Sequence, residues 1–298
     1  MGWKTIIIGS ECFASVSVGR LKITIGNEYQ TFPLNDVDTI IFSHSRATIT
    51  TPLICSLIEN NINIVICDSR NDPIGIFQPF NGHSLVFKQL NKQINWKVTR
   101  KKKLWKRIVE LKIKSEIDAL NLLGIGGDVN KTLEEYMNSV YNDDQTNREA
   151  SAARVYFMTL FGKNFTRDED NNINYGLNYG YKIIASYISK CITARGLLTQ
   201  LGIHHIGESN PFNLTYDFIE PIRSLIDIWV YLNIKDNFNT NHKREIIELF
   251  EQKVFIKDKW LRLSDALEDV VDSYISFLNE ERDSVLFIDL SKGIRSVS

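Results

Sequence analysis

The sequence predicts an α+β protein, with a small β domain at the N-terminus and a larger all-helical domain after it. Short runs rich in Ile, Val, Thr and Phe, separated by Gly, Asn and Asp, occupy residues 1–80 and are typical of strands. From about Lys88 the apolar residues recur every three or four positions, which is the period of an amphipathic helix. We therefore expect a β domain at 1–80, a linker at 81–87 and a helical domain at 88–298.

Local patterns place the elements of the β domain. Strands are expected at residues 5–8, 14–18, 21–25 and 39–42. Apolar residues alternate with polar ones around Gly19-Arg20, which indicates two strands with one buried face each, joined by a two-residue hairpin turn. A helix at 52–60 and a buried strand at 62–67 complete an expected sheet or sandwich.

The bulk properties are those of a soluble globular protein. Hydrophobic residues make up 43% of the 298 positions and charged residues 24%, and the net charge of −1 excludes a histone-like polycation. The four cysteines are widely spaced without a C-x-x-C pair, which argues against a structural zinc site or a disulfide framework. With no signal peptide and no apolar run of the roughly 20 residues that cross a membrane, we expect a cytoplasmic protein.

A basic segment opens the helical domain. Between Lys88 and Lys114 the sequence has a dense run of Lys and Arg against a single acidic residue, Glu110. Such a run could neutralise several phosphates of a nucleic acid, or it could be an ordinary solvated helix face. The interleaved Trp96 and Trp105 are either core anchors or platforms on which bases stack. The candidates for DNA binding within the run are Arg100, Lys101, Lys102, Lys103, Lys106 and Arg107.

Three separated stretches could form a single metal site. Glu149 begins a strong helix pattern, His204-His205 follows about fifty residues later, and Asp217 and Glu220 are spaced i, i+3 on one helix face. Carboxylates and an imidazole are suitable ligands for a divalent ion that acts on a phosphodiester.

Each stretch also has a structural explanation. Glu149 suits the first turn of a helix capped by Asn147, where it would interact with the helix dipole. Adjacent histidines face different ways, so at most one of them would serve a shared site. Asp217 and Glu220 could belong to a capping box. Only the combination of the three stretches points to chemistry.

Four motifs, taken in order, resemble a known family. They are E-x-x-x-A-R-x-Y-F at 149–157, N-Y-G-Y at 178–181, G-I-H-H at 202–205 and N-L-x-x-D-x-x-E-P-x-R at 213–223. As an ordered set they closely resemble the CRISPR-associated spacer-acquisition integrases, the near-universal Cas endonuclease family. The fuller pattern N-R-E-x-x-A-A-R-V-Y-F, with F-T-R-D-x-D-N-x-I-N after it, is most similar to members from type II systems.

The resemblance implies a metal site and its ligands. By motif match the family's Glu, His and acidic ligands fall on Glu149, His205 and Glu220, and Asp217 matches a further acidic position that supports the site. Many members have Asp where this chain has Glu220, and the longer carboxylate should still bind Mg²⁺ or Mn²⁺. Arg154, within the first motif, joins the basic run as a candidate for holding the DNA backbone.

The resemblance also implies a reaction and partners. The 3′-hydroxyl of a short captured duplex would attack the end of a CRISPR repeat by transesterification, and water at the same site would give an endonuclease. The family works as a homodimer joined through its β domains, with two dimers bridged by a dimer of a small ferredoxin-like Cas partner. A type II effector nuclease and a ring-shaped DNA-end-binding Cas protein are further expected associates.

Two alternatives remain open from the residues. One is a structure-selective, metal-dependent nuclease of DNA repair that uses the same site. The other is a non-catalytic DNA-binding scaffold, in which Glu149 and Glu220 are only carboxylates at the starts of helices.

Overall fold

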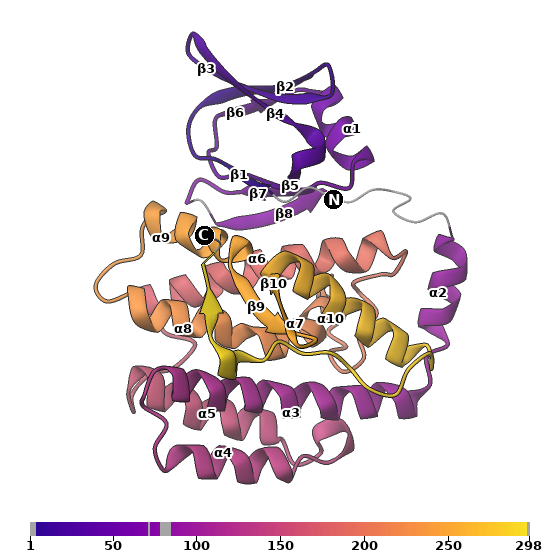
Figure 1. The fold of residues 1–298 in the computed structure, drawn as a ribbon, viewed down its shortest axis with the longest axis vertical. Helices are drawn as coiled ribbons and strands as arrows, with labels where there is room; N and C mark the ends of the chain where they lie inside the picture. Colours follow the sequence, from indigo (N-terminus) through magenta and orange to yellow (C-terminus); the bar gives the residue numbers. More distant parts are fainter. Residues whose placement is uncertain (1–3, 71, 78–84, 297–298) are drawn as a thin grey trace. The chain divides into compact units, whose positions relative to one another are not determined.

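The computed structural model describes residues 4–70, 72–77 and 85–296, and the chain forms two compact units (Figure 1). The first unit comprises Met1–Val86 with Thr193–Gly196, and the second comprises Phe87–Ile192 with Leu197–Ser298. Strands dominate the first unit and helices the second, so the predicted α+β class is confirmed. Most of the expected linker, at 81–84, lies outside the described residues, and helix α2 (Val86–Ile94) already begins within its last part.

Among its described residues, the first unit contains two four-stranded sheets and the α-helix α1. One sheet has the order β1 (Lys4–Ile8), β5 (Val37–Phe42), β7 (Asn63–Cys67) and β8 (Pro73–Phe77), parallel except for β8. The other has the order β4 (Glu28–Pro33), β3 (Arg20–Ile25), β2 (Cys12–Ser17) and β6 (Ala47–Ile49). Helix α1 (Thr51–Glu59) contributes Leu53 and Leu57 to a core that also includes Leu21 and Ile40.

The hairpin between β2 and β3 turns one residue earlier than predicted. Val18 and Gly19 both have positive φ, 49° and 67°, as the two central residues of a type I′ turn require. The segments expected as strands all contribute to strands, but β4, β6 and β8 were not predicted. Strand β4 is partly or fully exposed along its length and rich in polar residues, so it shows no apolar alternation to recognise.

Nine α-helices make up most of the second unit as far as it is described. They are α2, α3 (Val98–Leu122), α4 (Val129–Asn138), α5 (Arg148–Phe161), α6 (Asn172–Ala194), α7 (Asn213–Ile219), α8 (Arg223–Asn233), α9 (Thr240–Glu248) and α10 (Leu263–Leu278). None of the helices in the described part of the chain is long and apolar enough to cross a membrane.

A small sheet in the second unit departs from the predicted all-helical domain. Its antiparallel strands lie in the order β10 (Lys259–Arg262), β9 (Lys253–Ile256) and β11 (Ile294–Arg295). Lys257 and Asp258, both at positive φ, form the turn between β9 and β10. These strands are two to four residues long and their turn lacks glycine, so neither signal of a hairpin was present in the sequence.

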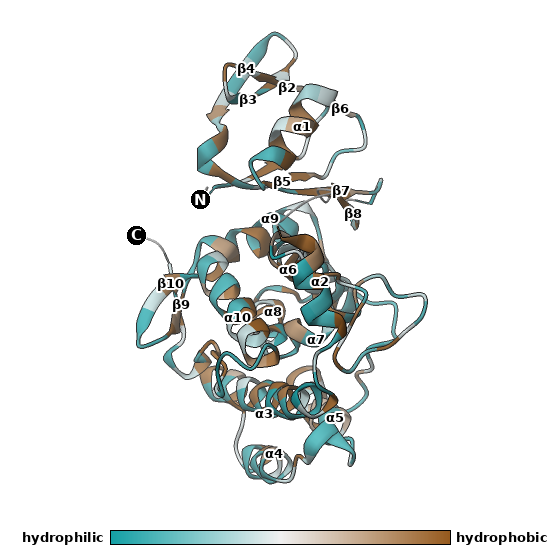
Figure 2. Ribbon diagram, turned by 90° about the vertical axis from the view of Figure 1, so that its right-hand side faces the viewer, coloured by the Kyte–Doolittle hydropathy of each residue, from teal (hydrophilic) through white to brown (hydrophobic). Residues whose placement is uncertain are grey.

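Helix α3 is the central helix of the second unit, and it packs against α4, α5, α7, α8 and the short 3₁₀ helix η3 (Glu220–Ile222). It alternates hydrophobic and hydrophilic residues along its length (Figure 2). Leu104, Trp105 and Ile108 on its inner face are fully buried. The same face continues into Lys112 and Glu116, which are only 8% and 2% exposed. Buried ionisable groups of this kind are rarely tolerated without partners, so they mark a polar centre inside the helical unit.

Candidate active site

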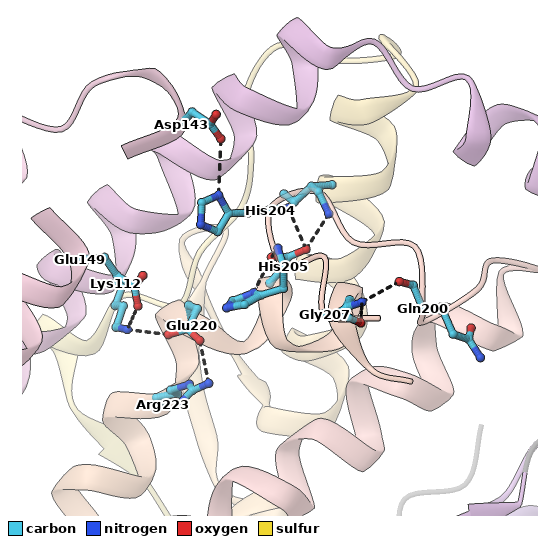
Figure 3. Close-up of polar contacts among 12 residues, drawn as sticks. Lys112, Asp143, Glu149, Gln200, His204, His205, Gly207, Glu220 and Arg223 are labelled. Carbon is cyan, nitrogen blue, oxygen red and sulfur yellow. Dashed lines mark hydrogen bonds and ion pairs between the residues drawn. The ribbon is translucent and has the colours of Figure 1, made fainter. Parts of the chain in front are cut away.

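Two carboxylates from distant parts of the chain converge on one lysine. Lys112 Nζ, on α3, lies 2.5 Å from Oε1 of Glu149 on α5 and 2.6 Å from Oε2 of Glu220 on η3 (Figure 3). The side chains of Lys112 and Glu220 are 10% and 4% exposed, whereas that of Glu149 is 25% exposed. The predicted residues Glu149 and Glu220 are thus brought to the same point, and a cation lies between them.

Asp144 fixes the start of the helix that carries Glu149. Its buried carboxylate accepts hydrogen bonds from the backbone N–H groups of Arg148, at 2.8 Å, and Glu149, at 2.9 Å. The predicted cap, Asn147, has a left-handed φ of 50°, and its side chain makes no capping hydrogen bond. Asn147 is therefore the N-cap residue, as predicted, but the capping hydrogen bonds go to Asp144, which reaches the helix from a separate 3₁₀ turn. Glu149 does lie in the first turn, where the helix dipole stabilises a carboxylate.

Asp217 organises the loop that carries His205. Its fully buried carboxylate accepts hydrogen bonds from the backbone N–H groups of Ile203, at 2.6 Å, His204, at 3.3 Å, and His205, at 3.0 Å. Oδ1 of Asp217 also lies 2.8 Å from Nδ1 of His205. When Nδ1 donates its proton to this carboxylate, Nε2 is left as an acceptor or ligand atom. Asp217 is thus not part of a capping box but contacts His205.

The imidazole of His205 is directed toward Glu220 in Figure 3. The hydrogen bond that the ring donates to Asp217 raises the pKa of His205, which burial would otherwise lower. The loop has no room for a larger residue before the histidines, because a Cβ on Gly202 would lie 2.2 Å from the carbonyl oxygen of His205 and 2.8 Å from Asp217 Oδ2. The hydrogen bond to Asp217 therefore orients the ring of His205, and the close approach of Gly202 holds the loop backbone that carries it.

His204 makes a different contact from His205, although the two rings lie edge to face with centroids 5.7 Å apart. Its ring stacks on Trp105 with centroids 4.1 Å apart, and its Nδ1 lies 3.4 Å from Oδ1 of Asp143. The planes of the two imidazoles differ by 84°. Trp105 is fully buried, and Trp96, 5% exposed, donates its Nε1–H to Asn279 over 2.9 Å. Both tryptophans are therefore core anchors rather than platforms for bases.

Two cations keep Glu220 ionised in spite of its burial. Burial alone would raise the pKa of Glu220, but Arg223, 2.7 Å from Oε1, and Lys112 outweigh it and hold that pKa below its usual value. Burial would likewise lower the pKa of Lys112, yet Glu220 and Glu149 raise it overall. The site therefore pairs the side chains of Glu149 and Glu220 with the ammonium of Lys112 and the guanidinium of Arg223.

Sequence reasoning did not assign Lys112 and Arg223 to the site. Lys112 was counted with the basic run, although it lies four residues after Ile108 on the apolar stripe of α3, and this spacing was a usable signal. Arg223 lies in the last of the quoted motifs, where it had no stated role.

The predicted DNA-binding residues fall into two groups. Arg100 is 15% exposed, lies 2.9 Å from Asp283 and stacks over Phe277, so it braces α3 against the end of α10. Three others have acidic neighbours: Lys102 pairs with Asp143, and Lys106 and Arg107 pair with Glu110. Lys101, Lys103 and Arg154 have no ion pair with any residue in the described ranges. These last three side chains are the most available to phosphates.

A cleft of about 610 Å³ opens beside His205. Lys101 lines it together with Gln200, His205 and Asn213, so an extended ligand in the cleft would contact the imidazole and a cation at once. Oligonucleotides are among the ligands of that kind.

The donor set fits a divalent metal ion. Two carboxylates and an imidazole provide ligands that Mg²⁺ and Mn²⁺ accept, and the two carboxylates already meet at one cation. Within residues 4–70, 72–77 and 85–296, however, no three His, Cys, Asp or Glu side chains lie close enough together to hold a metal as they stand. The ammonium of Lys112 lies between the carboxylates of Glu149 and Glu220.

Known proteins that resemble this chain agree with what its motifs and its fold indicate. The model of the family described as "CRISPR associated protein Cas1" matches residues 5–258. The chain belongs to the Cas1 family. The "CRISPR-associated endonuclease Cas1" of Neisseria meningitidis serogroup C (strain 8013) is 32% identical over 280 residues, which are 92% of this chain and 91% of that protein.

Two solved structures show that the fold is shared at lower identity. A casposase bound to its integration product superposes with a TM-score of 0.75 at 20% identity and covers 97% of this Cas1 chain and 94% of its own. A chain of a Cas6-RT-Cas1–Cas2 complex superposes with a TM-score of 0.72 at 18% identity, over 94% of this chain and 35% of that one. The resemblance that the sequence motifs indicated is thereby confirmed at the level of the family and the fold.

Proposed function

We propose that this Cas1 protein is a metal-dependent DNA endonuclease and integrase of CRISPR adaptation, which acts in the cytoplasm and inserts short foreign DNA into a CRISPR array. The observation that supports this most directly is the convergence of Glu149 and Glu220 on one cation, beside an imidazole oriented by Asp217. The Neisseria relative is named an endonuclease, and the casposase of similar fold was solved with an integration product.

The site residues have separate tasks in this proposal. Glu149, His205 and Glu220 would hold Mg²⁺ or Mn²⁺, which when bound would stabilise the charge that develops at the scissile phosphate and on the leaving oxygen. Asp217 keeps His205 in the tautomer that presents Nε2. Arg223 pairs with Oε1 of Glu220 and helps to keep this carboxylate ionised.

The reaction is an exchange of one phosphodiester for another. The 3′-hydroxyl oxygen of the captured duplex forms a bond to a phosphorus atom at a repeat end, and the bond from that phosphorus to the neighbouring 3′-oxygen breaks. The proton of the attacking hydroxyl is lost and the leaving oxygen gains one, so no external energy source is needed. Water in place of the hydroxyl would give strand cleavage instead.

DNA would be held by the cations that lack acidic partners. Lys101 lines the cleft beside His205, and Lys103 and Arg154 are exposed. Contacts of this kind go to phosphates and position a duplex without reading its sequence. They suit an enzyme that captures DNA of any sequence.

We also propose the assembly that the family resemblance implies. Two copies of the chain would pair through their β units, and a dimer of a small ferredoxin-like Cas partner would bridge two such pairs. A type II effector nuclease and a ring-shaped DNA-end-binding Cas protein are the further proposed associates. The Cas1–Cas2 complex among the structures of similar fold supports the small partner.

A strand-transfer assay tests the proposed function. A labelled short duplex is incubated with a repeat-containing plasmid, the small partner and Mn²⁺ or Mg²⁺, using the wild type, His205→Ala and Glu149→Gln. We expect metal-dependent joining at the repeat ends by the wild type and a loss of about 100-fold or more in each variant, because a ligand is missing. Circular dichroism and DNA binding of the variants provide the controls for folding.

The same assay separates the alternatives. Cleavage of branched DNA without any joining would favour the repair nuclease, and DNA binding with neither activity would favour the scaffold. Joining by His205→Ala at the wild-type rate would remove His205 from the mechanism.

A further inference from the structure

The position between Glu149 and Glu220 is filled by a cation of the protein itself. The Nζ atom of Lys112 contacts a carboxylate oxygen of each, at 2.5 and 2.6 Å. A second cation could not approach the same two oxygens at bonding distance while this nitrogen remains there. The two carboxylates are also the residues that would hold the divalent ion.

We propose that Lys112 is a displaceable internal counter-ion, whose ammonium stands between Glu149 and Glu220 in the metal-free protein and must withdraw for the divalent ion to bind. This inference rests on the metal site of the proposed function. It adds that the ammonium of Lys112 competes with the divalent ion for that site. The free protein would then bind the ion more weakly than its ligands alone would allow.

The burial of the carboxylates explains why the metal-free site needs a cation from the protein itself. Glu220 is 4% exposed, and two carboxylates facing each other there without a cation would be strongly destabilising. Lys112 removes this repulsion while the site is free of metal, so the three elements that carry these residues can pack before an ion arrives. A structural ion pair alone would need only one of the two carboxylates.

The charges of the cluster argue for displacement rather than for simultaneous binding. Glu149 and Glu220 are balanced by Lys112 and Arg223, so a divalent ion added to all four would leave two net positive charges in a buried space. Arg223 binds the other oxygen of Glu220 and can remain. The side chain of Lys112 has a flexible four-carbon stem. It contacts Glu149, the more exposed of the two carboxylates, so its ammonium can move toward solvent on that side.

The binding of Mn²⁺ to the purified full-length chain tests this inference without any assay of activity. Isothermal titration is carried out on the wild type, Lys112→Met, Lys131→Met and Glu149→Gln. We expect Lys112→Met to bind Mn²⁺ about tenfold more tightly or better, since removing a like charge from the site favours the ion. Lys131→Met removes the same charge from an exposed lysine that pairs with Asp128, and it should bind like the wild type.

A second measurement uses the wild-type protein alone. Lys112 is buried, so an amine-modifying reagent should label it poorly in EDTA and several-fold faster in Mn²⁺, as read by mass spectrometry. Lys131 should be labelled equally in both. If Lys112→Met does not fold, Lys112→Gln takes its place, because an amide can still donate hydrogen bonds to both carboxylates without a charge.

The outcomes distinguish this inference from the proposed function. Equal or weaker Mn²⁺ binding by a folded Lys112 variant, or unchanged labelling of Lys112 in the metal-bound wild type, would overturn the counter-ion and leave the metal site standing. If neither the wild type nor Lys112→Met bound Mn²⁺, or if Glu149→Gln bound it as tightly as the wild type, the counter-ion and the proposed metal site would both be wrong. Tighter binding by the variant together with metal-dependent labelling would establish the displacement.

Discussion

Glu116 places a protonated carboxyl group beneath the candidate site. It lies one helical turn after Lys112 on α3, is 2% exposed, and has one side-chain oxygen without a hydrogen-bond partner among the described residues. Burial raises its pKa to about 8, against the opposing effect of Lys112, while Asp227, Glu149 and Glu220 raise it further. The neutral form is therefore the one that the fold accommodates at pH 7.

The stability of the protein should fall as the pH rises from 4.5 to about 8, because of Glu116. The unfolded residue loses its proton near pH 4.5 and the folded one only near pH 8, so between these values the folded state binds more protons. The free energy of unfolding should therefore decrease by up to about 1.4 kcal/mol per pH unit from this group and level off above pH 8.

Glu116→Gln measures this contribution. The amide does not titrate, so urea denaturation of the variant in EDTA should show a flatter profile between pH 5 and 8, and the gain over the wild type should be largest at pH 8. Asp227, whose pKa burial raises to about 6, titrates in both proteins and cancels in the comparison. Parallel profiles for the two proteins would mean that Glu116 is ionised in the folded state.

At the scale of residues, the sequence identified the groups that lie within recognisable motifs. Glu149, His205, Asp217 and Glu220 each stand in a short pattern, and the structure brings them to one region. The position of Lys112 on the apolar stripe of α3 marked it as buried, but its partners lie 37 and 108 residues away, and no local pattern encodes which groups it contacts. Asp144 was missed for a similar reason, since it caps α5 from outside that helix.

At the scale of elements, two glycines of α6 allow α8 and the residue that follows it to pack closely against α6. A Cβ added at Gly180 would lie 2.5 Å from Cγ2 of Ile226 on α8, and one at Gly176 would lie 2.3 Å from Ile234. Helix α8 begins with Arg223, the partner of Glu220, so this close packing helps to position the site. The small residues of α6 suggested close packing against the helix of Glu149, but Gly180 lies against Ile226 of α8. Helical periodicity shows which face of a helix is buried and does not show which helix packs on it.

The contact between α6 and α8 can be tested with a double-mutant cycle. Gly180→Ala should destabilise the protein by about 1–3 kcal/mol through overpacking, and Ile226→Ala by about 2–5 kcal/mol through the cavity it leaves. Since the new methyl group would occupy part of that cavity, the double variant should be more stable than the sum of the two effects by about 1 kcal/mol or more. Gly75→Ala, where a Cβ meets nothing within 4 Å, is the matched control in the same urea titrations. Simple additivity would contradict the close approach.

At the scale of the whole molecule, a net charge of −1 conceals an uneven distribution of charge. The basic run predicted a nucleic-acid surface as one unit, but the structure divides it. Lys92, Lys97 and Arg100 pair with the acidic group Glu280, Glu281 and Asp283 after α10, whereas Lys103 is exposed and has no ion pair in the described part of the chain. Composition gives the number of charges, and only the folded chain decides which are neutralised.

This division predicts different effects of mutations on DNA binding. Lys103→Ala and Arg154→Ala should each weaken binding of a short duplex at low salt and make the plot of log K against log[salt] less steep by about 0.9, the change expected for one lost phosphate contact. Arg100→Ala should leave that slope unchanged and lower the free energy of unfolding by about 1 kcal/mol, since it removes a brace to Asp283 and Phe277. Fluorescence anisotropy over a salt series and urea denaturation measure the two quantities, with Lys131→Ala as the control for a lost surface charge. If Arg100→Ala instead reduced the slope without affecting stability, Arg100 would be a DNA contact that exchanges its acidic partners for phosphate when the duplex binds.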